Sequence, residues 1–88
     1  MKITQVDRDG TYKMGTLYDL TLAQIQKALG FEPEDESTDG KVRWFFAFDV
    51  EDGEEDHFCA IWDWKGSADS DEWSYFGPRH IIDKVLGR

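Results

Sequence analysis

Carboxylates are the side chains of this 88-residue chain with the clearest capacity for chemistry, and they gather in three stretches. One stretch, residues 51–56, interrupts the most apolar part of the sequence, and the other two flank that part. Clustered carboxylates can hold a divalent cation, transfer protons or attract a basic partner. The two flanking stretches contribute Glu32, Glu34, Asp35, Glu36, Asp39, Asp69, Asp71 and Glu72.

The spacing of these groups does not favour a metal site. Residues 35–40 match the first half of a calcium-binding loop, but Phe46 stands where such a loop needs a bidentate glutamate. A zinc site would draw on His57, Cys59 and His80, and the sequence offers no second closely spaced pair of ligands. We therefore predict neither a metal nor another cofactor.

Cys59 is the single cysteine and the only thiol available for nucleophilic catalysis. It stands in the apolar run 58–64, where burial raises the pKa of a thiol and makes it unreactive. The sequence also lacks a phosphate-binding loop, a Gly-x-Ser-x-Gly motif and a dinucleotide-binding fingerprint. We therefore predict a buried structural cysteine, no catalytic residue and no enzymatic activity. The absence of any internal disulfide is typical of a protein of the reducing cytoplasm.

A second candidate site is the aromatic and basic group formed by Trp73, Tyr75, Phe76, Arg79 and His80. Such a group can stack a nucleotide base and hold its phosphate, helped by the amides at the start of the following helix. The alternative is that the rings fill the core beneath that helix, and we favour this interpretation.

The formal net charge of −9 limits the classes of partner. A charge of this sign and size argues against direct binding to nucleic acid or to an anionic membrane, and it favours basic protein surfaces. No apolar run approaches the length of a membrane-spanning helix. The acidic composition is equally compatible with a role in solubility alone.

The elements that must position these groups are organised around a central hairpin, with strands at 42–50 and 58–64. Any even-numbered turn around Gly53 leaves the same residues on each face, because strand side chains alternate. The predicted pairs are Val50 with His57, Phe48 with Cys59, Phe46 with Ile61 and Phe45 with Trp62. One predicted face carries Val42, Trp44, Phe46, Phe48, Val50, Cys59 and Ile61, and the other carries Phe45, Ala47, Phe58, Ala60, Trp62 and Trp64.

The rest of the chain adds a hairpin and two helices. Residues 2–14 predict a hairpin turning at Asp9-Gly10. Thr21 and Gln24 form a capping box for a helix ending at Gly30, and Pro78 opens a final helix. We predict one domain, residues 1–88, of the α+β class: a small antiparallel sheet in the order β-β-α-β-β-α, with two short helices packed on it. One helix on each face is favoured over two helices on one face, which would leave Trp62 and Trp64 as a binding surface.

Loops alternate between the two ends of an antiparallel sheet whose strands follow one another. The acidic loops 32–39 and 69–72 should therefore emerge together, with 51–56 at the opposite end. A dense carboxylate surface presents charge much as a phosphate backbone does, so it should be drawn to a basic nucleic-acid-binding groove.

Three segments carry a resemblance to a known group of proteins. They are residues 22–33, the IWDWKGS box at 61–67 and the WSYFGP box at 73–78. Together they resemble small acidic proteins encoded by bacteriophages, over roughly residues 20–87. The resemblance implies inhibition of a host defence protein, such as a restriction or CRISPR effector, in the bacterial cytoplasm, in some cases by mimicking DNA. It supplies no catalytic residue.

A monomer and a homodimer are both compatible with the sequence. A third possibility for function is a structural or assembly protein that pairs through exposed aromatic side chains.

Overall fold

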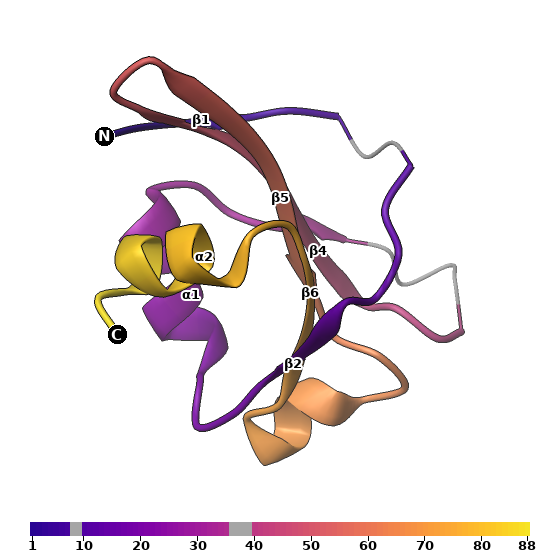
Figure 1. Cartoon of the computed structure of the whole chain (residues 1–88). Coiled ribbons are helices and arrows are strands. Elements are labelled where there is room, and N and C mark those ends of the chain that lie inside the picture. Colours follow the sequence, from indigo (N-terminus) through magenta and orange to yellow (C-terminus); the bar gives the residue numbers. More distant parts are fainter. Residues whose placement is uncertain (8–9, 36–39) are drawn as a thin grey trace.

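One antiparallel sheet runs through the whole chain (Figure 1). The computed structural model describes residues 1–7, 10–35 and 40–88. The strand order is β1-β4-β5-β6-β2, with β3 paired to the same edge of β4 as β1. The predicted α+β class is confirmed, whereas the predicted order lacked β3 and β6. The elements are β1 (Lys2–Gln5), β2 (Gly15–Leu17), α1 (Leu22–Leu29), β3 (Glu34–Asp35), β4 (Trp44–Asp52), β5 (Glu55–Trp62), η1 (Ser67–Ser70), β6 (Trp73–Phe76) and α2 (Arg79–Leu86).

The central hairpin, β4 and β5, has the predicted register. All four predicted pairs are present, from Val50 opposite His57 to Phe45 opposite Trp62. Both strands extend further towards the turn than expected, because Asp52 pairs with Glu55 around a two-residue turn in place of a six-residue loop, and both stop two residues short of the predicted bounds at the other end. Gly53 supplies the positive φ of 68° that the tight turn needs. The register survives this change because both turn lengths are even.

The predicted hairpin within residues 2–14 is wrong. β1 pairs with β4, with Lys2 opposite Glu51, whereas β2 pairs with β6, with Gly15 opposite Tyr75. The two strands therefore lie at opposite edges of the sheet, and Asp9 of the predicted turn lies outside the described residues. The long strand β4 offers an open edge to which a short polar strand can add, so long-range pairing replaces the local turn.

Both helices cover the same face of the sheet (Figure 1). Ile25 of α1 and Ile82 of α2 are fully buried in one cluster with Phe46, Phe48 and Ile61. The preferred arrangement, with one helix on each face, is therefore wrong. The premise behind it, that both apolar faces of the hairpin need covering, still applies, because other residues pack on the second face.

The second face is partly covered by the described residues of the connection between β1 and β2, 6–7 and 10–14. Because these strands lie at opposite edges, their connection must cross the sheet, and the helices already occupy the first face. Val6 packs against this face, and its backbone N–H donates to the carbonyl of Ala47 at 3.1 Å. Further along, the ring of Tyr12 meets Phe76 edge-on, with centroids 5.0 Å apart. The crossing segment thus packs on the face of the sheet that a second helix was expected to cover.

The helix ends follow the sequence closely. The hydroxyl of Thr21 accepts from the N–H of Gln24 at 3.1 Å, and the Gln24 side chain accepts from the N–H of Thr21 at 2.8 Å. Gly30 ends α1 with a φ of 83°. Pro78 is the residue before the first turn of α2, one position earlier than predicted. The fixed φ of proline suits either position.

Asp63 joins the two ends of the central hairpin. Its carboxylate is 2% exposed, and Oδ1 accepts from the backbone N–H groups of Arg43 at 2.9 Å and Trp44 at 2.7 Å. The chain leaves the regular strands at this point, so the predicted alternation ends. Val42 consequently packs with the second face, against the prediction that it joins Trp44 on the first.

Candidate functional site

The two flanking acidic loops emerge at one end of the sheet. Residues 34–35 pair with the start of β4, which lies opposite the end of β5. The segment η1 follows β5 and leads into β6, whose first residues also pair with the end of β5. The register therefore places the described parts of both loops at the same end of the sheet, as the alternation of loops predicted. Glu36 and Asp39 lie outside the described residues.

The described carboxylates of this loop end face solvent. Glu32, Glu34, Asp35, Asp69 and Asp71 are exposed, and Glu72 is half-buried. Within the described part of the chain, Asp69, Asp71 and Glu72 form no ion pair with a basic side chain. Their charge is thus available to a partner.

Cations also occur at the loop end, which the sequence analysis overlooked. Lys41, Arg43 and Lys65 are exposed there. The backbone N–H of Lys65 donates to the carbonyl of Lys41 at 2.6 Å, so the two lysines are held close together. Their ammonium groups lie 5.8 Å and 5.7 Å from the ring centroid of Trp64. The loop end is therefore a mixed surface, in which a basic and aromatic area adjoins the carboxylates.

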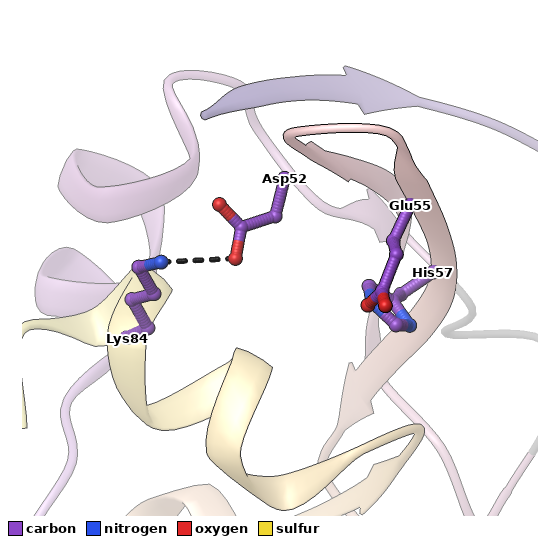
Figure 2. Close-up of polar contacts among 4 residues, drawn as sticks. All are labelled: Asp52, Glu55, His57 and Lys84. Carbon is purple, nitrogen blue, oxygen red and sulfur yellow. Dashed lines mark hydrogen bonds and ion pairs between the residues drawn. The ribbon is translucent and has the colours of Figure 1, made fainter.

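The opposite, hairpin end places like charges across from each other. Glu51 lies opposite Asp56, and Asp52 lies opposite Glu55, an arrangement that is unfavourable without compensation. Neighbouring side chains offset this repulsion (Figure 2). The Nζ of Lys84 on α2 donates a hydrogen bond to Oδ2 of Asp52 at 2.9 Å, and Nε2 of His57 lies 3.1 Å from Oε2 of Glu55. The hydrogen bond from Lys84 lowers the pKa of the Asp52 carboxyl. Two of these carboxylates are thus engaged within the chain.

The five residues of the second candidate site do not come together. Trp73 and Tyr75 point into the core beneath the helices, and Trp73 donates from Nε1 to the carbonyl of Leu20 at 2.7 Å. Phe76 lies on the opposite face, since neighbouring residues of β6 alternate. The prediction that these rings belong to the core is therefore confirmed for Trp73 and Tyr75.

The basic members of that set lie on the surface of α2. The guanidinium of Arg79 lies over the Tyr75 ring, with 5.3 Å between Cζ and the centroid, and it is paired with Asp83 at 3.0 Å. His80 is exposed, and its ring centroid lies 6.3 Å from that of His57. These groups pack against the outside of the core and do not enclose a ligand with Trp73.

Trp64 and Tyr12 are large exposed aromatic side chains that belong to neither site predicted from the sequence. Trp64 is 40% exposed and Tyr12 is 64% exposed, while Trp62 is almost wholly buried. The arrangement with two helices on one face did name Trp62 and Trp64 as a binding surface. Of the two tryptophans in that alternative, Trp64 is accessible and Trp62 is not.

Cys59 is fully buried in the helix-facing core. Burial, with a smaller contribution from the charge of Asp49, raises the pKa of its thiol from 9.0 to about 12. A thiol of this kind is protonated at neutral pH and does not act as a nucleophile.

We therefore expect native Cys59 to react with an aromatic disulfide reagent at least roughly tenfold more slowly than in urea, because the thiol is fully buried and its raised pKa leaves little thiolate. Absorbance of the released thiolate at pH 8 measures both rates. Labelling at the same rate in the native and unfolded chains would contradict this assignment and restore a redox or catalytic role.

In residues 1–7, 10–35 and 40–88, no three His, Cys, Asp or Glu side chains gather closely enough to hold a metal ion. Within the same ranges, no helix has the length and apolar character needed to cross a membrane.

Comparison with protein-family models, curated proteins and solved structures finds no match to this chain. We therefore infer function from the residues and their geometry.

Proposed function

We propose that this protein is a non-enzymatic binding protein whose acidic loop end occupies a basic, nucleic-acid-binding surface of another protein. One observation carries the proposal: Asp69, Asp71 and Glu72 share an end with the 32–35 segment and have no cationic partner among the described residues. Unpaired surface carboxylates keep their full attraction for a basic partner.

The class of partner follows from charge. A formal net charge of −9 gives long-range attraction to basic surfaces, which are typical of proteins that bind nucleic acid. The resemblance to small acidic bacteriophage proteins supports a host defence protein as that partner, with the bacterial cytoplasm as the place of action. The mechanism is occlusion: the acidic end competes with nucleic acid for one surface.

The test begins with the full chain as bait in a bacterial lysate, followed by elution with duplex DNA or with RNA. A partner that uses its nucleic-acid site should be displaced by nucleic acid and by raised salt. A partner released by neither agent would contradict occlusion.

Neutralising the loop end should slow association with that partner by about tenfold or more, because electrostatic steering raises association rates by roughly 10–10³-fold. The variant carries Asn or Gln at Glu32, Glu34, Asp35, Glu36, Asp39, Asp69, Asp71 and Glu72. Surface plasmon resonance at two salt concentrations measures the association rate.

The matched control neutralises the hairpin end, at Glu51, Asp52, Glu54, Glu55 and Asp56. It removes five carboxylates from the opposite end of the sheet, against eight in the loop variant. Equal effects per charge removed would show that net charge alone governs binding. If neither variant changes the rate, the acidic loops serve solubility only.

A further inference from the structure

A hollow of about 430 Å³ opens on the second face of the sheet. The connection at 11–13 borders it, and Phe45 and Trp62 line it with stacked rings whose centroids are 5.4 Å apart. Its volume lies in the range of roughly 300–1,000 Å³ that is usual for small-molecule sites. The remaining lining residues are Val42, Trp64 and Ser74.

Trp64 is held in place although its ring is exposed. Its backbone N–H donates to the hydroxyl of Ser67 at 3.0 Å, and its carbonyl accepts from the N–H of Ser67 at 3.1 Å. The next residue, Lys65, has a φ of 54°, a left-handed conformation that is unfavourable for a residue with a Cβ. The surrounding structure thus maintains a strained turn that presents a tryptophan ring. Stacking on a ring whose backbone is already fixed loses little conformational entropy.

Positive charge gathers beside this ring. Lys13 lines the hollow, and the ammonium of Lys65 lies 5.7 Å from the centroid of Trp64. Neither lysine forms an ion pair within the described residues. The Debye length at physiological salt is about 8 Å, so the carboxylates of the distant hairpin end contribute little to the local potential, whereas Glu72 in the adjoining hollow reduces it.

The carboxylate of Glu72 favours a ligand whose negative charge is confined to one group. Glu72 lines an adjoining hollow that shares Lys13, Trp64 and Ser74 with the first. Its carboxylate disfavours a ligand that spreads negative charge across both hollows. A single phosphate group therefore suits the site better than a triphosphate or a nucleic-acid chain.

We propose that this hollow binds a mononucleotide, with the base stacked on Trp64 and the phosphate held by Lys13 and Lys65. Every base offers a π-face to an aromatic ring, and lysine ammonium groups are common phosphate ligands. The hydroxyl of Ser74, a residue that is 2% exposed, is placed to hydrogen-bond the edge of the base. This site adjoins the acidic loop 69–72 through Glu72 but uses other residues to hold its ligand, so it does not depend on the function proposed above.

The first experiment titrates the full chain with adenosine 5′-monophosphate, with adenosine and with inorganic phosphate. We expect the nucleotide to move the indole N–H resonance of Trp64 while those of Trp44 and Trp73 stay in place, since the latter two lie in the helix-facing cluster. Titration calorimetry should show that the nucleotide binds at least tenfold more tightly than adenosine or inorganic phosphate.

The second experiment separates stacking from charge. Trp64→Ala should weaken nucleotide binding about tenfold or more, as expected for loss of one base-stacking contact. The double variant Lys13→Gln, Lys65→Gln should remove the preference for the nucleotide over adenosine and most of the salt dependence. Lys27→Gln removes an exposed cation from α1, away from the hollow, and should change nothing.

Three results would overturn the proposal. The first is the absence of any nucleotide-dependent shift at Trp64 at roughly millimolar concentration. The second is equal binding of adenosine and the nucleotide. The third is a concentration-dependent dimer that Trp64→Ala converts to a monomer, which would make a second copy of this chain the occupant. Circular dichroism of each variant establishes that it is folded. If Trp64→Ala does not fold, the lysine variants still test the site.

Discussion

Replacing Phe46 with alanine should lower the free energy of unfolding by about 3–5 kcal/mol. The Phe46 ring is fully buried, with Trp73 and Phe31 at centroid distances of 6.2 Å and 6.1 Å. Its removal leaves a cavity beneath α1 and α2 that the surrounding side chains cannot fill. A domain of this size has only about 4–13 kcal/mol of total stability, so a large part of the chain should unfold at moderate temperature.

Urea denaturation followed by tryptophan fluorescence measures this loss. Tyr18→Ala is the matched control, because Tyr18 is also aromatic but is 57% exposed, and surface changes usually stay within about 0.5 kcal/mol. A Phe46→Ala protein that unfolds at the same urea concentration as Tyr18→Ala would refute the assignment of the helix-facing core.

Gly77→Ala should cost about 3 kcal/mol. Gly77 has a φ of 113°, and a Cβ at this position would meet the sulfur of Cys59 at 2.8 Å and the carbonyl oxygen of Phe58 at 3.0 Å. A side chain in such a backbone conformation costs about 1–3 kcal/mol, and overpacking adds a similar amount. The atoms that a Cβ would meet include backbone atoms of Phe58 and Cys59, which cannot move aside as a flexible side chain can.

Gly30→Ala separates the two contributions. Gly30 has a comparable φ of 83° but no atom within 4 Å of the added Cβ, so only the backbone cost of about 1–2 kcal/mol applies. Thermal unfolding of both variants gives the difference. Equal losses would mean that the approach of Gly77 to β5 is looser than the structure indicates.

The close approach at Gly77 explains how β6 connects to α2. The chain must leave β6, pass directly over Cys59 of β5 and begin α2 above the core. Only glycine allows that path, because the turn has no room for a side chain. The same geometry buries the thiol of Cys59, so the unreactive cysteine and the glycine are two consequences of one packing arrangement.

The loop end combines the two proposals in one region. Asp69, Asp71 and Glu72 offer carboxylates with no cationic partner among the described residues, and Trp64 lines both the hollow on the second face and the adjoining one that contains Glu72. The loop variants and the Trp64 variants therefore need to be compared in both assays. A loop variant that loses the protein partner but keeps the nucleotide would show that the sites act independently.

Local patterns determined the parts of the fold that depend on neighbouring residues. The register of β4 and β5 followed from strict alternation around an even turn. The capping box at Thr21 and the glycine at 30 defined α1, because helix ends are satisfied by side chains within a few positions. The burial of Cys59 followed equally from its apolar neighbours.

The sequence by itself thus determined the α+β class, the central hairpin, the helix boundaries to within one residue, and the common end of the sheet for the described parts of the two acidic loops. Only the tertiary structure decided that β1 joins β4, that both helices share a face, and that Trp64 stays exposed beside Lys13 and Lys65. The physical reason is range. Alternation and capping act between residues close in the chain, whereas the choice of a sheet edge depends on which distant surface is still uncovered when that segment packs.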